Sequence, residues 1–248
     1  YEHVPMVPWF FVYSNDIANT YKDIETKADT IGYPLIIKPA NLGSSIGIEI
    51  VHKKDELKSA LSECAKYDDK LVIEKMVKQL KEINISVMGN SKDAKVSAIE
   101  EVMKGDEFLS FSNKYLGGGK GTKGSKPTKV APTKGSKGMA SASRIVPARL
   151  DGNQQKEIEE YALKSFKALN ASGAVRIDFM IDKEDGSVYV NEINSIPGSL
   201  AFYLWKEVGV DFREECDLLI NNALNVYREK KKKVRSFDTN ILSNYKEN

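Results

Sequence analysis

The sequence predicts an α+β fold with two subdomains, a smaller one over residues 1–77 and a larger one over residues 78–248. In the first part, short apolar segments bounded by proline or glycine flank one amphipathic helical segment. In the second part, β-like segments are joined by the turn sequences "NSKD" and "DKEDG". The chain of 248 residues is 41% apolar and 29% charged, which is typical of a folded protein with a substantial core.

The smaller subdomain should contain three strands and a helix. "YPLIIKPA" predicts a buried strand, because Leu35–Ile37 is an uninterrupted apolar run between prolines. The Gly/Ser loop "NLGSSIG" follows, and "IEIV" predicts a second strand. Asp55–Lys66 has helical spacing of its apolar residues, with Asp55 at the end where an acidic side chain is favourable. "KLVIEKMV" predicts the third strand, and the unit ends near Val77.

The larger subdomain should begin with two β-like segments, "EINISVMG" and "AKVSAIEEV". Asn153–Asn170 predicts an amphipathic helix, because its apolar residues recur on one side. "GAVRIDFMI" and "SVYVNEIN" predict a hairpin around "DKEDG". Asp211–Lys231 predicts a long terminal helix, and the cationic run Lys230–Lys233 suits its C-terminus.

Positive charge is concentrated in residues 113–141, which hold seven lysines and no acidic residue. Without these lysines the chain has 30 basic against 35 acidic residues, although its formal net charge is +2. A nucleic-acid-binding tail, a flexible linker or a lid over a phosphate site would each explain the tract. Its single aromatic residue, Tyr115, leaves few platforms for base stacking, so nucleic-acid binding is disfavoured.

Several other classes of protein are disfavoured by the sequence. Cys64 and Cys216 lack metal-ligand spacing, so two reduced thiols in a cytoplasmic protein are expected. No apolar run approaches the roughly 20 residues that span a bilayer. No Ser/His or Cys/His constellation is present. The chain does not begin with Met, so we expect a piece of a longer protein.

A cluster of charge is expected on the second hairpin. If its turn centres on Asp185, then Asp178 opposes Glu192, Arg176 opposes Asn194, and all four side chains lie on one sheet face. Two opposed carboxylates repel each other unless a positive group lies between them. Because Asp, Glu and Asn oxygens suit Mg²⁺, the pattern indicates either a magnesium site or a surface ladder that Arg176 neutralises.

A second group of polar residues follows the strand that ends at Lys38. A lysine at a buried strand end needs an anionic partner or access to water. Gly43 and Gly47 allow close backbone approach to a ligand, and the hydroxyls of Ser44 and Ser45 suit phosphate oxygens. A simple turn would explain the loop equally well. At the end of the third strand, Glu74 is either a ribose-binding acid or an ordinary surface residue.

Seven ordered segments resemble the ATP-grasp fold of D-alanine–D-alanine ligases: "LIIKPANLGSSIG", "LVIEKMV", "KEINISVMGN", "NKYL", "VPARL", "AVRIDFM" and "NEINSIPG". The resemblance implies two α+β subdomains that clasp a nucleotide between antiparallel sheets. It also implies an ATP-dependent carboxylate–amine ligase that joins two D-alanines through an acyl phosphate for peptidoglycan precursors. A ligase of the D-Ala-D-Ser or D-Ala-D-Lac type and a non-catalytic MgATP-binding module are the alternatives.

The resemblance implies roles for individual residues. Lys114 would reach the γ-phosphate, Tyr115 would orient Ser44 near the reacting centre, and residues 114–143 would close as a lid. Arg176 would stabilise developing oxyanion charge. Two Mg²⁺ ions, with Mn²⁺ as the alternative metal, would be held by Asp178, Glu192 and Asn194. The implied cofactor-binding positions are Lys38, Gly43, Ser44, Ser45, Gly47, Glu74, Lys75, Val77, Glu82, Lys114 and Met180.

The chain departs from the family pattern in two places. The family's N-terminal domain, which helps to bind the first amino acid, has no counterpart here, so this piece alone is expected to be an incomplete enzyme. In "PGSLAFYLW", Tyr203 falls at about the position of a family serine that binds the second substrate's carboxylate, and Ser199 is the nearest serine. The acceptor is therefore open. The expected partners are D-alanine and ATP, without a membrane, and a homodimer is expected for the full-length protein.

Overall fold

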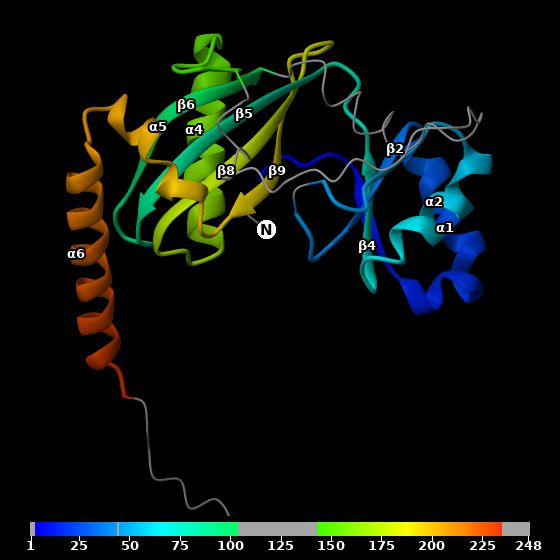
Figure 1. Ribbon diagram of the computed structural model, residues 1–248, viewed down its shortest axis with the longest axis horizontal. Helices are drawn as coiled ribbons and strands as arrows, with labels where there is room; N and C mark the ends of the chain where they lie inside the picture. The colour runs from blue at the N-terminus through cyan, green and yellow to red at the C-terminus, as the bar shows by residue number, and fades with distance from the viewer. Residues whose placement is uncertain (1–2, 44, 104–142, 235–248) are drawn as a thin grey trace, which may run out of the picture.

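The computed structural model describes residues 3–43, 45–103 and 143–234, and consists of two sheets that stand side by side (Figure 1). Every strand pair in both sheets is antiparallel. In Figure 1, α1 and α2 lie on the outer side of the first sheet, and α4 lies behind the second. The predicted α+β class is confirmed.

The first sheet has the strand order β1-β4-β2-β3. Its strands are β1 (Trp9–Tyr13), β2 (Leu35–Pro39), β3 (Glu49–Val51) and β4 (Lys70–Lys75). The 3-10 turns η1 (Ser14–Asp16) and η2 (Lys54–Glu56) lead into α1 (Ile17–Ile31) and α2 (Leu57–Cys64). Alternate strand residues, such as Leu35 and Ile37, form a core with the two helices. Their neighbours Ile36 and Lys38 therefore point to the opposite face, so the run Leu35–Ile37 is not buried on both sides.

Two elements of this unit, β1 and α1, are not among the predicted ones. In α1, apolar residues do recur at helical spacing and pack on the core of the first sheet, so the sequence held a helical signal that the prediction missed: Ile17, Tyr21, Ile24, Ala28 and Ile31. In β1, the letters "WFFVY" form an apolar run without visible alternation, although only Val12 is buried. The two faces of this strand therefore differ in burial but not in residue type.

The second sheet has the strand order β7-β6-β5-β8-β9. Its strands are β5 (Leu80–Gly89), β6 (Ala94–Met103), β7 (Ser143–Ile145), β8 (Gly173–Asp182) and β9 (Val188–Asn194). One face packs against α4 (Gly152–Ala168), and Ile83, Ile85 and Phe166 are among the residues of that core. The chain then continues through η3 (Gly198–Ala201), α5 (Phe202–Lys206) and α6 (Phe212–Lys231), which extends away from the sheet (Figure 1). The predicted strands and helices of this unit are confirmed with small shifts at their ends.

A buried hydrogen bond fixes α5 on the second sheet. Trp205 Nε1 donates to Ser86 Oγ at 3.0 Å, and Ser86 Oγ donates to the carbonyl oxygen of Val175 at 3.0 Å. Ser86 follows Ile85 on β5, so it points away from the face that packs against α4. The short helix thus lies on the opposite face, which is also the face of Arg176 and Asp178.

The β8–β9 hairpin has the predicted pairs at the charged cluster, but for a different reason. Asp178 pairs with Glu192 and Arg176 with Asn194. Nearer the turn, Ile181 pairs with Val188, one residue out of step with a turn centred on Asp185. A bulge between Asp178 and Phe179 restores the expected register. The assumed turn centre was therefore wrong, whereas the pairing was right.

The predicted subdomain boundary at residue 77 falls in the segment that joins β4 to β5. The first described residues belong with the other unit, since Val4 packs against the core of the second sheet. Val190 N also donates to the carbonyl oxygen of Pro5 at 2.9 Å. The division into residues 1–77 and 78–248 stays a prediction.

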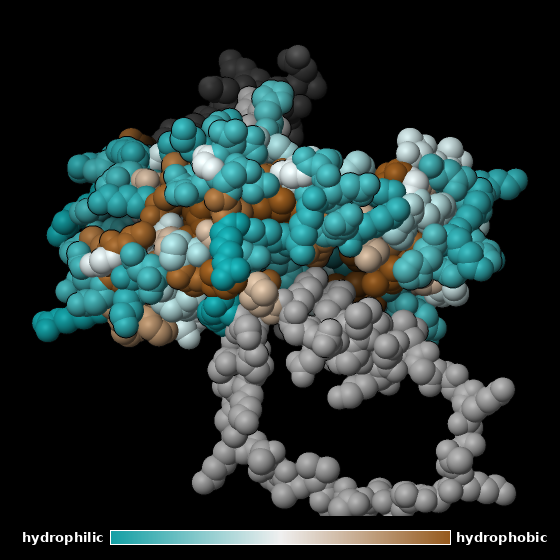
Figure 2. All heavy atoms as spheres, turned by 90° about the horizontal axis from the view of Figure 1, so that it is seen from above, coloured by the Kyte–Doolittle hydropathy of each residue, from teal (hydrophilic) through white to brown (hydrophobic). Residues whose placement is uncertain are grey.

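Hydrophilic side chains cover most of the face seen in Figure 2, with hydrophobic patches between them. None of the helices in the described part of the chain is both long and apolar enough to cross a bilayer. The lysine tract at residues 113–141 lies outside the described residues. Of the lid predicted over residues 114–143, the structure describes only residue 143.

Candidate nucleotide and metal site

A cavity of about 780 Å³ lies between the two sheets. This volume is typical of a site for a small organic ligand. The first sheet contributes Lys38 and Glu74 to its wall, and the second contributes the charged hairpin. The predicted site residues that line it are Lys38, Gly43, Ser45, Glu74, Val77, Glu82, Arg176, Asp178, Met180, Glu192 and Asn194. Residues far apart in the sequence thus face one another across a single space.

The hairpin cluster is joined by short hydrogen bonds. Arg176 Nε and Nη2 donate to Asp178 Oδ1 and Oδ2 at 2.6 and 2.8 Å, a two-pronged ion pair. Asn194 Nδ2 donates to Asp178 Oδ2 at 3.1 Å and to Glu192 Oε1 at 3.3 Å. The four side chains therefore lie on one face, as the period-two pattern predicts.

Burial dominates the electrostatics of this cluster. It raises the pKa of Asp178; the Arg176 guanidinium opposes that shift, and the Glu192 carboxylate adds to it. The hydrogen bond to Asp178 raises the pKa of Arg176. Two acids brought together on a partly buried surface favour a positive group beside them. Arg176 supplies one such group, and the cavity side of the carboxylates is a place for another.

The donor set at this position fits Mg²⁺. Asp178 and Glu192 provide hard carboxylate oxygens in directly opposed register, and Asn194 can provide an amide oxygen. In this structure Asn194 presents its amide nitrogen to both acids, so a half-turn of the amide would bring its oxygen to a cation. Mg²⁺ usually takes one or two protein carboxylates and completes its shell with water and phosphate oxygens.

Asn84 belongs to the cluster and is not among the predicted residues. With its amide nitrogen oriented toward Asp178, Asn84 Nδ2 donates to Asp178 Oδ1 at 3.2 Å. Asn84 pairs with Asp178 between β5 and β8. That strand pairing is long-range, so no local pattern in the sequence could have indicated it.

Lys38 has the anionic partner that its position requires. Its Nζ lies 2.7 Å from Glu74 Oε1 and donates to Asn191 Oδ1 at 3.4 Å. Lys38 and Glu74 are neighbours on the first sheet, whereas Asn191 lies on β9 of the second. Asn191 was not predicted, because it is the extra residue of the bulge and no sequence signal marks a bulge. The contact with Asn191 crosses from one side of the cavity to the other.

The Gly/Ser loop needs glycine at one of its two positions. Gly47 has φ +72°, and an added Cβ would lie 2.8 Å from the Tyr67 ring and 2.9 Å from the Pro39 ring. Around Gly43 no atom lies within 4 Å of such a Cβ. Gly43 and Ser45 line the cavity. Three residues with predicted roles, Ser44, Lys114 and Tyr115, lie outside the described residues.

Apolar residues line the cavity together with the predicted base-binding positions Val77, Glu82 and Met180. They were not predicted as lining residues and comprise Ile36, Ile50, Met76 and Leu80. Lys75 differs from its neighbours, because its Nζ donates to the carbonyl oxygens of Gly32 and Tyr33 at 2.8 and 3.2 Å. Its side chain satisfies carbonyls that follow α1, and Lys75 is not among the residues that line the cavity.

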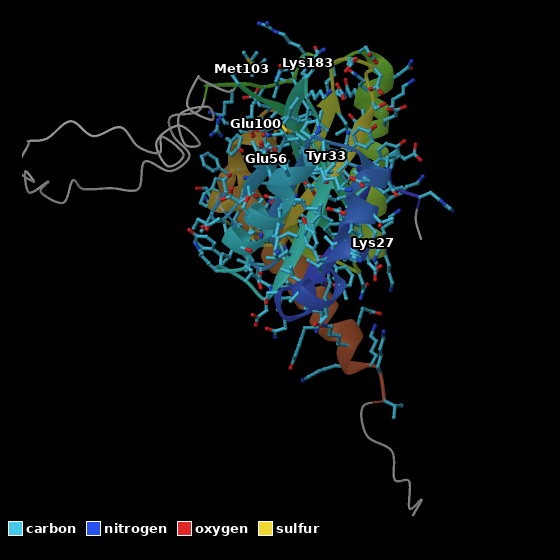
Figure 3. The ribbon with its side chains drawn as sticks, turned by 90° about the vertical axis from the view of Figure 1, so that its right-hand side faces the viewer. Lys27, Tyr33, Glu56, Glu100, Met103 and Lys183 are labelled. Atoms are coloured by element: carbon cyan, nitrogen blue, oxygen red, sulfur yellow. The ribbon has the colours of Figure 1, made fainter. Side chains whose placement is uncertain are left out.

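A second charged cluster lies at the cavity wall formed by β6 and β7. Glu100 is only 2% exposed, and Figure 3 shows it deeper in the molecule than Met103 of the same strand. Tyr203 Oη donates to Glu100 Oε2 at 2.7 Å, and Arg144 Nε lies 3.3 Å from Glu100 Oε1. The Arg144 guanidinium also stacks over the Tyr203 ring at 4.5 Å. Burial and the hydrogen bond to Glu100 raise the pKa of Tyr203, so its hydroxyl stays protonated as a donor.

Comparison with known proteins identifies relatives along most of the chain. The family model described as "D-ala D-ala ligase C-terminus" matches residues 2–145 and 133–221. The D-alanine–D-alanine ligase of Thermosipho africanus is 36% identical over 245 residues, which cover 97% of this chain and 59% of that protein. The ligase of Thermosipho melanesiensis is 41% identical over 212 residues, covering 86% of this chain and 52% of that protein. The chain thus spans between half and two-thirds of the length of these relatives.

Solved structures agree with the sequence relatives. The VanG D-Ala:D-Ser ligase from Enterococcus faecalis has a TM-score of 0.67 and 25% identity over 89% of this chain and 57% of its own. A D-alanine–D-alanine ligase from Bacillus anthracis complexed with ATP has a TM-score of 0.65 and 24% identity over 93% of this chain and 65% of its own. These likenesses confirm the predicted ATP-grasp fold.

Proposed function

Because the chain belongs to the D-Ala-D-Ala ligase C-terminal family, we propose that it supplies the nucleotide and metal site of an ATP-dependent carboxylate–amine ligase. The proposed reaction joins two D-alanines for peptidoglycan precursors in the cytoplasm. The observation that carries the proposal is the group of Arg176, Asp178, Glu192 and Asn194 on one wall of a cavity whose other wall presents Lys38.

The chemistry proceeds in two transfers. The carboxylate of the first amino acid attacks the γ-phosphorus of ATP, the bond to the β,γ-bridging oxygen breaks, and an acyl phosphate and ADP result. The amine of the second amino acid then attacks the acyl carbon and loses a proton, and the C–O bond to phosphate breaks. No nucleophilic side chain is needed, so the protein's part is to position the reactants and to neutralise charge.

Charged groups on both walls of the cavity take part in the proposed reaction. Lys38, which now pairs with Glu74, would turn to the nucleotide phosphates, and Glu74 would be released to accept from the ribose hydroxyls. Arg176 would stabilise the oxyanion that forms at the acyl carbon, because its guanidinium is held rigidly by Asp178. Mg²⁺ held by Asp178, Glu192 and Asn194 would supply further charge neutralisation on the phosphate oxygens.

The test is product formation by the protein at its full natural length. With MgATP and D-alanine, we expect phosphate release and a D-Ala-D-Ala dipeptide detected by mass spectrometry, and neither with L-alanine. Turnover with D-serine or D-lactate as the acceptor but not with D-alanine would contradict the specific assignment. Binding of MgATP without phosphate release, whatever amino acid is added, would contradict a ligase and favour a non-catalytic nucleotide-binding module.

A further inference from the structure

The second charged cluster continues a row of polar residues that crosses the second sheet. Across the paired strands, Glu192 lies opposite Asp178, Asp178 opposite Asn84, and Asn84 opposite Glu100. Arg144 follows on β7, where it pairs with Val102, two residues from Glu100 on the same face. Neighbouring strands lie about 4.8 Å apart, so Glu100 is roughly 10 Å along the row from Asp178.

The cluster is built to hold Arg144 in one orientation. Each oxygen of the buried Glu100 carboxylate has its own partner, Tyr203 on one and Arg144 on the other. The guanidinium carbon also lies 4.5 Å from the centre of the Tyr203 ring, a cation–π contact that helps to hold the group in place. A buried acid engaged in this way costs desolvation free energy, and three side chains from β6, β7 and α5 must meet to form the group. Both Glu100 and Arg144 line the cavity, so the group faces the ligand space.

The proposed reaction leaves one carboxylate that needs a cation. The first amino acid loses its carboxylate charge when it is phosphorylated, whereas the second keeps its carboxylate free throughout. The acyl phosphate would lie near Asp178 and Glu192, with Arg176 beside it. The second amino acid must bring its amine to this acyl phosphate. If it lies along the row of polar residues, its carboxylate is directed toward β6 and β7.

We infer that Arg144 binds the carboxylate of the second, attacking amino acid, and that Glu100 and Tyr203 are positioning residues that orient its guanidinium. A guanidinium carries five N–H donors, so it can hold Glu100 and a substrate carboxylate together. The inference rests on the proposed function and adds to it the residue that selects an acceptor with a carboxylate.

An internal competition tests the inference in the protein at its full natural length. MgATP and D-alanine are supplied with an equal concentration of D-alaninamide, which has the same amine but no carboxylate. Mass spectrometry then gives the ratio of D-Ala-D-Ala to D-Ala-D-alaninamide, and this ratio does not depend on the overall rate. Arg144→Met should lower the ratio about 10- to 100-fold, the effect of losing a hydrogen bond to a charged group.

Matched variants separate binding from positioning. Arg144→Lys should restore part of the ratio. Tyr203→Phe should lower it by less than Arg144→Met, because Phe keeps the ring beneath the guanidinium and removes only the hydrogen bond that holds Glu100. Arg149→Met, at an exposed arginine that does not line the cavity, should leave the ratio unchanged. MgATP affinity, measured on each variant, should stay at the wild-type value, whereas the melting temperature of Arg144→Met should fall, because the buried Glu100 loses its cationic partner.

The outcomes distinguish the two proposals. A wild-type protein that forms neither product overturns the proposed function and the inference with it. A wild-type protein that forms the dipeptide, together with an Arg144→Met variant that keeps the wild-type ratio, overturns the inference alone. If Arg144→Met does not fold, Arg144→Lys and Tyr203→Phe decide, and unchanged ratios in both would overturn the inference.

Discussion

Asp178 and Glu192 form an opposed pair of acids at the cavity wall. They face each other across two strands, and burial already disfavours the charge on Asp178. In an acid pair of this kind, a cation relieves repulsion that hydrogen bonds from Arg176 and Asn194 only partly offset. The arrangement therefore makes more sense as a cation site than as a surface ladder.

Removing either charge should abolish Mg²⁺-dependent turnover. We expect Glu192→Gln and Asp178→Asn to lower the rate of phosphate release at least about 100-fold, because charge stabilisation in the transition state is lost. Glu184→Gln, at an exposed acid near the tip of the same hairpin, is the control and should retain activity. Circular dichroism should show an unchanged fold in all three variants. Wild-type turnover in either site variant would refute the metal-site assignment.

Glu215 provides a prediction on stability rather than activity. It is fully buried near the start of α6, and neither carboxylate oxygen has a hydrogen-bond partner among the described residues. Burial raises its pKa from the ordinary 4.5 to about 7. Between these values the native state keeps a proton that the unfolded chain has released, so the free energy of unfolding falls as pH rises.

The pH dependence of the melting temperature checks this effect. From pH 4.5 to 7 the wild-type protein should lose stability, and Glu215→Gln, which cannot ionise, should show a smaller loss. The neighbouring exposed Glu214→Gln should follow the wild-type curve. Identical slopes in Glu215→Gln and the wild type would show that Glu215 is not the group responsible.

At the scale of single residues, the sequence indicates which side chains could act in a site better than it indicates which of them contact one another. Alternation predicts that Arg176 and Asp178 share a face of β8, and that Glu192 and Asn194 share a face of β9. That both pairs lie on the same face of the sheet depends on the bulge between them, so that part of the prediction was right for the wrong reason. Asn84, Glu100 and Arg144 were not predictable, since their places in the site depend on β5, β6 and β7, which join the hairpin through long-range pairing. Asn191 depends on a bulge, a feature without a sequence signature.

Among the elements, the loop between β2 and β3 depends most on one backbone conformation. Gly47 has a positive φ and lies where a Cβ would overlap the rings of Tyr67 and Pro39. We expect Gly47→Ala to lower the free energy of unfolding by about 1–3 kcal/mol through backbone strain and overlap. Gly43→Ala, where the space is open, should have a much smaller effect on stability.

Thermal unfolding of Gly47→Ala and Gly43→Ala measures how much stability each variant loses. MgATP binding then shows whether the change in the loop affects the cavity. A distorted loop should weaken MgATP binding in Gly47→Ala, because Gly43 and Ser45 line the same cavity. If Gly47→Ala melts at the wild-type temperature, the loop tolerates a side chain and the conformational argument fails.

The elements differ in how much of them a local pattern could predict. Apolar periodicity made α4 predictable, and turn sequences defined the hairpins. The segment of α1 also carries apolar residues at helical spacing, among them Ile17, Ile24 and Ile31, so this helix could have been predicted from the sequence. By contrast, the faces of β1 cannot be read from its letters, because "WFFVY" is apolar throughout although only Val12 is buried.

At the scale of the molecule, the described residues form two hydrophobic cores and a small third cluster. One core lies between the first sheet and α1 and α2, and the other lies between the second sheet and α4. The third cluster contains Val7, Val77 and Met180, and the last two also line the cavity. Two units were predictable from the order of elements, but the cavity between them depends on how this small cluster joins the sheets.

A ligand in the cavity should therefore stabilise both units at once. MgATP at 100 times its Kd should raise the free energy of unfolding by about 2.7 kcal/mol, because it binds only the native state. Lys38→Met should lose most of this gain, since Lys38 is the cation that the first sheet presents to the nucleotide. Lys66→Met, at an exposed lysine paired with Glu63 outside the cavity, should keep it. Calorimetry with and without MgATP gives the shift for each protein. An equal shift in Lys38→Met and the wild type would mean that the nucleotide does not contact the first sheet through Lys38. The bound ligand would then not join the two units in the way proposed.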